Sequence, residues 1–261
     1  MDEGLKNLQR RLLEMLIEFQ DFTQEHGLEF FLVGGSALGA CRHEGFIPWD
    51  DDVDIAMMRS DFEKMEQLMQ ERGNRISEML YSPVEQHLMP DAPIGYLYDA
   101  THLEKGFANT AKIDIHPIDG VPESGFSRKL QKIVSLLYYL SEYRLPVKNK
   151  GKAIRLVSKV ILRLTPGFLF DFYMRTGKKF LTRWDDRTSR NICSLFGVAG
   201  YEREIMPRSY LMPLQEMRFE QHLFLVPGDI DPYLNRLYGN YREMPPAAER
   251  FPRHAIYKNY R

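Results

Sequence analysis

The sequence has few cysteines and no long apolar run. Its 261 residues include only Cys41 and Cys193. Two cysteines cannot form a disulfide framework or a typical zinc-ligand spacing, so we expect a reducing, cytoplasmic environment. No apolar run approaches the roughly 18 residues that span a bilayer. The acidic start at Met1–Gly4 is unlike a signal peptide, and we therefore expect no membrane-spanning or secretory segment.

The sequence also lacks repeats, low-complexity segments and a net excess of one charge. Its formal net charge is −1, and apolar residues make up 44 % of the chain. That apolar content is enough for a packed core and excludes a disordered chain. The length predicts one large domain or a catalytic domain with a smaller companion. A near-neutral chain of this size is unlike a nucleic-acid polymerase, so no nucleic-acid polymer is expected as a partner.

The overall neutrality conceals an uneven distribution of charge. Residues 1–123 contain 10 basic and 24 acidic residues, residues 124–190 contain 16 and 4, and residues 191–261 contain 9 and 8. The basic middle segment is interpreted as a solvated helical face, a surface for a polyanionic acceptor, or a surface for anionic lipid. Its basic residues alternate with apolar ones, a pattern that favours peripheral attachment at the inner membrane face or to a teichoic-type polymer. They are Arg128, Lys129, Lys132, Lys148, Lys150, Lys152, Arg155, Lys159 and Arg163.

Four aspartates gather within five residues, at positions 50, 51, 52 and 54. Like charges this close repel one another unless a cation lies among them. Alternate residues of a strand share a face, so we expect Asp50, Asp52 and Asp54 to point the same way. Carboxylate oxygens suit Mg²⁺ or Mn²⁺, which predicts a metal site here. Asp51 is interpreted as a loop residue or as support for the site.

Two further segments are typical of phosphate chemistry. The run Phe30–Val33 enters Gly34-Gly35-Ser36, which predicts a strand, a tight turn and a helix with Ser36 as its N-cap. Exposed amides at a helix N-terminus bind phosphate. Asp114 lies between two isoleucines in a predicted strand at 111–117, which Pro117 and Gly120 are expected to end. A phosphate-binding turn beside metal-binding carboxylates predicts a phosphoryl-transfer enzyme.

The periodicity of the rest of the chain predicts an α+β (α/β) fold. We expect a catalytic core at 1–123, a basic helical segment at 124–190, and a C-terminal hairpin and helix at 191–261 that complete the core. Segments near 75–82 and 94–100 are interpreted as strands or loops. Helices are predicted at 4–26, 36–43, 60–73, 126–144, 151–164, 166–184 and 231–238, and strands at 29–33, 52–58, 111–117 and in a hairpin at 217–226.

The motifs resemble those of a known family. The run from Gly34 to Ile55, with Phe46-Ile-Pro-Trp-Asp-Asp-Asp52 inside it, resembles the signature of the LicD family. That family is part of the nucleotidyltransferase superfamily of DNA polymerase β type and is related to fukutin and fukutin-related protein. Lys112–Asp119 and Tyr233–Gly239 resemble its third-acid strand and its C-terminal helix, whereas residues 124–200 contain no recognised motif. The resemblance implies a nucleotidyltransferase-type mixed β-sheet core with flanking helices and an additional helical segment.

The resemblance also implies a reaction. LicD-type proteins take a CDP-activated alcohol, commonly CDP-choline, and transfer the phosphoalcohol to a hydroxyl of a cell-surface glycan such as teichoic acid or lipopolysaccharide, releasing CMP. By motif position, Asp52, Asp54 and Asp114 are the expected catalytic residues. Asp114 is either the second metal's ligand or a general base. The expected metal ligands are Asp50, Asp52, Asp54 and Asp114.

Four further residues are expected to contact the donor. Gly35 and Ser36 are expected to hold a phosphate through a backbone amide and a hydroxyl. Arg42 is expected to pair with a phosphate oxygen. Trp49 is interpreted as capping the core or walling the substrate pocket, where aromatic faces bind quaternary ammonium groups.

Two other functions are compatible with parts of the pattern. One is transfer of NMP from an NTP to a small molecule, but such enzymes lack the Phe46–Asp52 run. The other is an inactive relative that binds glycan or nucleotide. The presence of Asp52, Asp54 and Asp114 together argues against an inactive relative.

Overall fold

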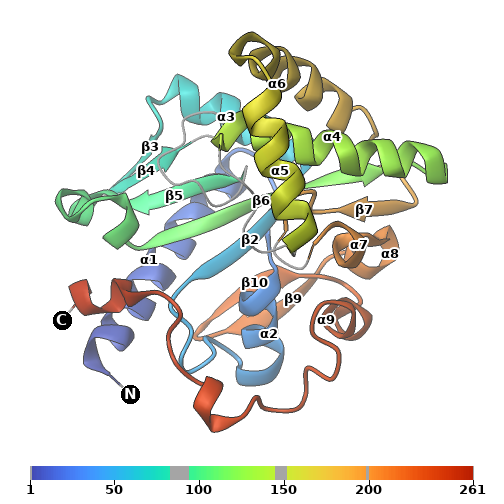
Figure 1. Ribbon diagram of the computed structural model, residues 1–261. Helices are drawn as coiled ribbons and strands as arrows, with labels where there is room; N and C mark the ends of the chain where they lie inside the picture. Colours follow the sequence, from blue (N-terminus) through green and yellow to red (C-terminus); the bar gives the residue numbers. More distant parts are fainter. Residues whose placement is uncertain (1, 83–93, 145–151, 198–199, 261) are drawn as a thin grey trace. The chain divides into compact units, whose positions relative to one another are not determined.

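The chain folds into two compact units, shown in Figure 1 as a computed structural model that describes residues 2–82, 94–144, 152–197 and 200–260. Among these residues, the first unit takes 2–82, 94–117 and 207–260, and the second takes 118–144, 152–197 and 200–206. Strands and helices are mixed, which confirms the predicted α+β class. No described helix is long and apolar enough to cross a membrane. Lys148 and Lys150 of the basic segment lie outside the described residues.

The first unit is built on a sheet with the strand order β1-β2-β6-β5-β4-β3. Its strands are β1 (Phe31–Leu32), β2 (Val53–Met58), β3 (Arg75–Ile76), β4 (Met79–Ser82), β5 (Gly95–Asp99) and the first part of β6 (Lys112–Val121). The pairs β1–β2 and β5–β6 are antiparallel, with Leu32 opposite Ile55 and Tyr96 opposite Asp114. The order places β2 and β6, the two strands with predicted site residues, side by side.

Helices cover this sheet because their apolar residues recur every three or four positions. Leu8, Leu12, Met15 and Phe19 are fully buried on α1 (Glu3–Glu25), which passes behind the strands in Figure 1. The helix ends before Gly27, whose φ of +62° lies in the left-handed region. The unit's other helices are α2 (Gly34–His43), α3 (Arg59–Glu71), α8 (Arg208–Leu211) and α9 (Ile230–Tyr238).

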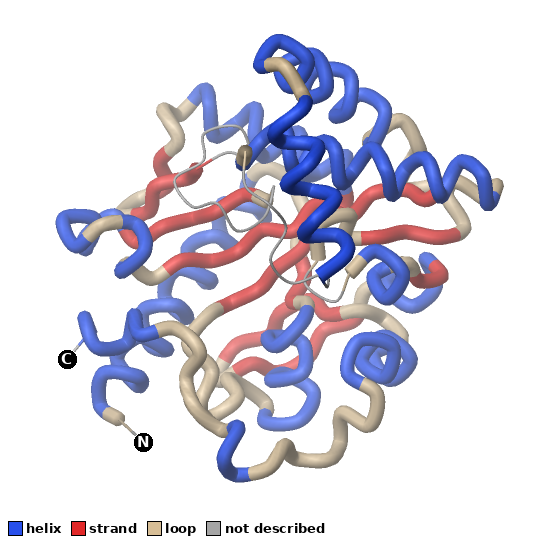
Figure 2. The backbone as a smooth tube through the Cα atoms, viewed as in Figure 1, coloured by secondary structure: helices blue, strands red, loops and turns tan. Residues whose placement is uncertain are grey.

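The C-terminal part of the first unit begins with the predicted hairpin. Strands β9 (Gln215–Phe219) and β10 (His222–Val226) pair around a turn and contact α2 and β1 respectively. After α9 the chain is mostly loop, as Figure 2 shows, with short 3-10 helices η3 (Ala247–Glu249) and η4 (Ala255–Tyr260). This loop leads toward α1, where Asn7 Nδ2 donates to the Tyr260 carbonyl at 2.9 Å.

Strand β6 is longer than the sequence predicts. We expected it to end at Pro117 and Gly120, but it continues to Val121. Its pairing with β5 ends at Ile115, and its pairing with β7 (Asn191–Cys193) begins at Asp119. Pro117 therefore falls between two partner strands, where its missing N–H removes no bond of either ladder. Gly120 is required because a Cβ there would lie 2.6 Å from the Trp184 carbonyl oxygen.

The second unit is mainly helical. It contains α4 (Gly125–Tyr143), α5 (Lys152–Leu164), α6 (Gly167–Leu181) and α7 (Tyr201–Glu204), with β8 (Met206–Pro207) following. Helices α4 and α6 pack closely because Gly177 leaves room for the Tyr138 ring. The buried core of this unit also includes Leu181, Cys193, Leu195 and Tyr201. All three long helices were predicted within three residues of their observed ends.

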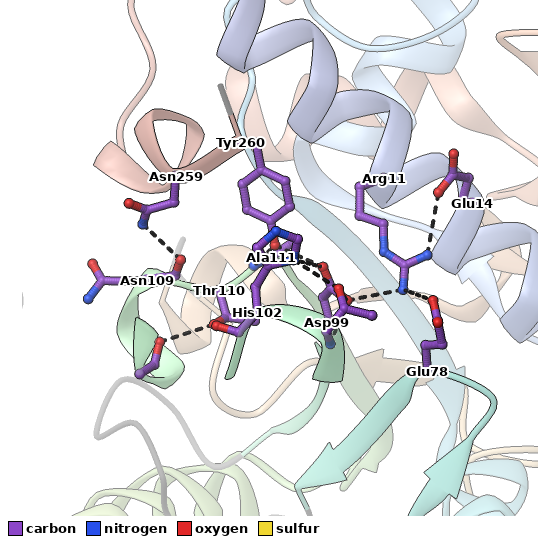
Figure 3. Close-up of polar contacts among 12 residues, drawn as sticks. Arg11, Glu14, Glu78, Asp99, His102, Asn109, Thr110, Ala111, Asn259 and Tyr260 are labelled. Atoms are coloured by element: carbon purple, nitrogen blue, oxygen red, sulfur yellow. Dashed lines mark hydrogen bonds and ion pairs between the residues drawn. The ribbon is translucent and has the colours of Figure 1, made fainter. Parts of the chain in front are cut away.

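One buried carboxylate joins α1, β5 and the C-terminal end of the first unit. Figure 3 shows Asp99, which is fully buried, accepting bonds from Arg11 Nη2 and the Tyr260 hydroxyl, each at 3.0 Å. Asp99 also accepts from the amide and hydroxyl of Thr101. Burial disfavours its charge, but the bonds from Arg11 and Thr101 outweigh burial and lower the pKa of Asp99 to about 2. The end of the chain is thereby held by a charged group in the sheet.

We expect Asp99→Asn to destabilise the fold by about 2 to 3 kcal/mol at neutral pH, because Arg11 loses a buried partner. The folded pKa lies below the unfolded value of about 3.9, so this stabilisation is complete above pH 4 and is lost as pH falls toward 2. Urea unfolding at pH 7 and pH 3 measures both effects. The difference in unfolding free energy between the wild type and Asp99→Asn should be smaller at pH 3 than at pH 7. Asp21→Asn, at an exposed position on α1, is the matched control. An equal difference in unfolding free energy between the wild type and Asp99→Asn at both pH values would contradict the lowered pKa of Asp99.

Candidate active site

The Gly34-Gly35 pair makes room for two carboxylates at the start of α2. A Cβ at Gly34 would lie 3.1 Å from Asp54 Oδ2, and one at Gly35 would lie 3.0 Å from Asp50 Oδ2. Gly34 also has a φ of +54°, which L side chains rarely adopt. The two glycines are therefore needed both for the turn and for the close approach of Asp50 and Asp54. The N-terminus of a helix favours negative charge, which fits this placement.

Ser36 lies inside the helix and is not its N-cap. The left-handed turn at Gly34 starts α2 two residues earlier than predicted, and Val33 takes the cap position without a side-chain bond. The buried Ser36 hydroxyl instead accepts the Asp54 N–H at 3.0 Å. Gly34 N–H donates to the Tyr233 hydroxyl of α9 at 2.9 Å. Ser36 and Tyr233 thus fix the glycine turn against β2 and α9.

Only one of the three aspartates expected on one strand face lies in a strand. Strand β2 begins at Val53, so Asp54 belongs to it, whereas Asp50 and Asp52 lie in the preceding loop. The Asp50 N–H donates to the Ile47 carbonyl at 2.8 Å, which closes a turn and delays the strand. Gln9 of α1 donates to the Asp50 carbonyl at 2.8 Å and holds this loop. The loop nevertheless keeps the carboxylates close, because oxygens of Asp50 and Asp52 lie within 4.8 Å of each other and Asp50 and Asp54 approach adjacent glycines.

Asp114 joins the cluster from β6, the strand beside β2. Ile113 and Ile115 are fully buried on the opposite face, as the alternation predicted. Lys112, two residues before Asp114 and on the same face, donates to the Asp114 carboxylate. Lys112 was missed by the sequence reasoning, although its spacing from Asp114 was a usable signal. His116, the next residue on this face, places Nε2 3.2 Å from Asp54 Oδ1.

The pKa shifts show an excess of negative charge. Burial and the charge of Asp54 raise the pKa of Asp50 to about 6. Burial, Asp54 and Asp50 also raise the pKa of Asp52, and burial raises that of Asp114 despite the ion pair with Lys112. Burial acts in the same direction on Asp54, but its contact with His116 outweighs burial and lowers its pKa.

Asp51 holds the C-terminal loop beside this cluster. It is buried and accepts the backbone N–H groups of Arg253 and His254 at 3.3 and 2.7 Å. The His254 ring lies between two carboxylates, with Nδ1 3.1 Å from Asp51 Oδ1 and 3.7 Å from Asp52 Oδ2. The bond to Asp51 raises the pKa of His254. Asp51 therefore supports the site, and it brings in His254, which no sequence motif indicated.

Arg42 and Trp49 both contact the C-terminal segment. Arg42 Nη1 donates to the Tyr241 carbonyl at 2.8 Å, and Tyr241 in turn bonds Asp231 of α9 through its hydroxyl. The Arg250 guanidinium lies 5.8 Å from the centre of the Trp49 ring, within cation–π range. These contacts bring residues 241–250 to the two positions predicted to bind substrate. The roles of Arg42 and Trp49 toward a donor stay predictions.

The donor set has the chemistry of a site for a hard divalent cation. Among the described residues, one oxygen from each of Asp50, Asp51 and Asp52 lies within 4.8 Å of the others. Asp51 already accepts two backbone N–H groups, so its oxygens are less available than those of Asp50 and Asp52. Burial first, and the charges of neighbouring aspartates after it, raise the pKa values of Asp50, Asp52 and Asp114, and a bound cation would oppose both effects. All-oxygen ligation fits Mg²⁺ or Mn²⁺.

Comparison with known proteins places these residues in a family. Residues 27–123 match the LicD/FKTN/FKRP nucleotidyltransferase domain. The chain is 25 % identical to the lipopolysaccharide cholinephosphotransferase LicD of Haemophilus influenzae over 266 residues, covering 96 % of each protein.

A shorter match is closer in sequence. The ribitol 5-phosphate transferases FKRP of human and mouse are each 45 % identical over 53 residues, which is 20 % of this chain and 11 % of each relative. The matched domain includes Asp50–Asp54 and Asp114, the residues that the fold brings together. Residues 27–123 are therefore similar to the LicD/FKTN/FKRP nucleotidyltransferase domain, in agreement with the resemblance that the aspartate and glycine motifs indicated.

Proposed function

We propose that this protein transfers a phosphoalcohol from an activated donor to a hydroxyl group of a glycan. The observation that carries the proposal is the group of aspartates at the Gly34-Gly35 turn: Asp50 and Asp54 approach the glycines, Asp52 lies beside Asp50, and Asp114 comes from the neighbouring strand β6. The named relatives support the reaction class, since one is a cholinephosphotransferase and the others are ribitol 5-phosphate transferases. Both transfer a phosphorylated alcohol, so we assign this chain to the same class of phosphotransferases.

The choice of phosphocholine rests on the longer match. The cholinephosphotransferase aligns over 96 % of this chain, whereas the ribitol 5-phosphate transferases align over 20 %. We therefore propose CDP-choline as the donor and a lipopolysaccharide or teichoic-type glycan as the acceptor. The acceptor hydroxyl attacks the phosphorus that carries choline, the bond between the two phosphates breaks, and CMP leaves.

We propose that Asp50, Asp52, Asp54 and Asp114 bind Mg²⁺ or Mn²⁺, which would neutralise phosphate oxygens in the transition state. Asp114 is positioned by Lys112 and is proposed to accept the hydroxyl proton or to complete the ligand set. His116 orients the Asp54 carboxylate through their 3.2 Å contact. Gly35 N–H and the Ser36 hydroxyl are proposed to bind a donor phosphate at the start of α2.

CMP release from CDP-choline, CDP-ribitol and CDP-glycerol, with Mg²⁺ and a candidate glycan, tests this function. We expect release with CDP-choline and a loss of about 100-fold or more for Asp54→Asn, because the variant loses a charge that acts on the transferred phosphate. Asp21→Asn, exposed on α1, should retain activity within about twofold. Full activity in Asp54→Asn would reject the site. Incorporation of NMP from CTP with release of pyrophosphate would instead support a nucleotidyltransferase, and no turnover with any donor would support an inactive relative.

Metal binding has an independent readout in thermal unfolding. Saturating Mg²⁺ or Mn²⁺ should raise the melting temperature by about 5 °C, because binding relieves repulsion among the carboxylates. Asp52→Asn should change both the melting temperature of the metal-free protein and its response to metal. Its metal-free form should melt at a higher temperature than the wild type, because the raised folded pKa of Asp52 means that its charge destabilises the fold at pH 7. Its response to metal should fall to less than half.

The control for the metal experiment is potassium chloride at matched ionic strength, which screens charge without specific ligation. Asp21→Asn should show the full response to metal. A wild-type melting temperature that responds equally to both salts would rule out the proposed metal site.

A further inference from the structure

Helix α5 of the second unit exposes a row of large apolar side chains. Leu156, Val160 and Leu164 recur every four residues and therefore share one face of the helix. Their exposed fractions are 64 %, 48 % and 73 %, and that of Val157 on the same side is 50 %. Contiguous exposed apolar surface of this kind marks a site of interaction rather than an ordinary solvated helix.

A basic stripe runs along one flank of this apolar row. Its members are Lys152, Arg155, Lys159 and Arg163, spaced three or four residues apart, and all four are exposed. Each residue advances the helix by about 100°, so the stripe adjoins the Leu156–Leu164 row. The inward side of the helix is marked by Ser158, which is fully buried. Helix α5 contains no acidic residue, so nothing along its length offsets the positive charge.

The next helix along the chain also exposes large apolar side chains. Phe168 and Phe172, four residues apart on α6, are 71 % and 57 % exposed. Aromatic and aliphatic side chains next to lysine and arginine are the composition of helices that lie in the interface of a bilayer. At 13 residues, α5 is too short to span a bilayer, where about 20 are needed.

We propose that α5 binds an anionic membrane surface, lying parallel to it with Leu156, Val160 and Leu164 among the acyl chains. The basic stripe then meets anionic headgroups, a charge complementarity that attracts the helix to the surface. A soluble polyanion has no hydrocarbon to cover the apolar row. A second copy of the chain would bring an identical basic stripe against this one, and like charges repel. A lipid surface is the partner that suits both the apolar row and the basic stripe.

Flotation of the full chain with vesicles tests the proposal. Vesicles of phosphatidylcholine with 30 % phosphatidylserine should carry the protein at low salt, and pure phosphatidylcholine should carry much less. The double variant Leu156→Gln with Val160→Gln should bind about tenfold more weakly or worse, because both side chains lose apolar area that the bilayer would bury. Leu223→Gln, an apolar residue of β10 with 55 % exposure, is the matched control and should bind as the wild type does.

The basic stripe has its own variant. Arg155→Gln with Lys159→Gln should weaken binding roughly 25-fold at low salt, taking about fivefold for each charge near an anionic surface. This difference should diminish as salt is raised, because salt screens the headgroup charge. Lys64→Gln, at an exposed lysine on α3 of the first unit, should weaken binding less than fivefold. Circular dichroism should show unchanged helix content in each variant.

Three results would overturn the proposal. The first is absence of binding to anionic vesicles, or equal binding by the wild type and both α5 variants. The second is a wild-type dimer in light scattering that Leu156→Gln with Val160→Gln converts to a monomer, which would make the row a contact between copies. The third is equally tight binding of soluble polyphosphate by the wild type and the apolar variant, with no vesicle binding. None of these measurements involves transfer of a phosphoalcohol, so they leave the proposed function unaffected.

Discussion

The constraint on which the first unit depends is the placing of four aspartates on neighbouring segments, with Asp50 and Asp54 close to the N-terminus of α2. Left to repel one another, Asp50, Asp52, Asp54 and Asp114 would open the structure around them. Two glycines let Asp50 and Asp54 reach the start of α2, Lys112 pairs with Asp114, and His116 contacts Asp54. The raised pKa values of three of these acids show that the compensation is incomplete. A fold that retains such repulsion gives up stability for a binding site, a common feature of functional clusters.

Much of the fold could be predicted because its helices and hairpin are local. The apolar period of α1 and the hairpin at β9–β10 depend on nearby residues, and both were predicted correctly. The errors have non-local causes. Pro117 would end an ordinary strand, but in β6 it falls between two partner strands that are distant in sequence. Ser36 has the chemistry of an N-cap, yet the left-handed conformation of Gly34 starts the helix earlier.

In the site, too, features set by nearby residues could be predicted and features set by distant residues could not. The aspartates that converge were identified from their spacing, and strand β2, the loop before it and the neighbouring strand β6 bring them together. His254 could not be identified in this way, because it reaches the site from roughly 200 residues away and carries no motif of its own. Tyr233 belongs to the run that resembles the family's C-terminal helix, but that run did not indicate its bond to Gly34. Both lie beyond residue 123, where the match to the family domain ends. The C-terminal loop and α9 therefore complete a site whose recognisable motif is N-terminal, and the 96 % coverage by the cholinephosphotransferase LicD extends over both parts.

The bonds between Asp51 and the amides of Arg253 and His254 have a consequence for synthesis. A ribosome makes the aspartate motif about 200 residues before it makes the segment that Asp51 holds. Contacts this distant in sequence form late in folding, and domains fold as their residues emerge. The nascent chain must therefore carry this acidic loop without its final partners while about 200 further residues are added. The surroundings of Asp51 can reach their final arrangement only once residue 254 has been added, so the candidate site is completed well after its aspartate motif has been made.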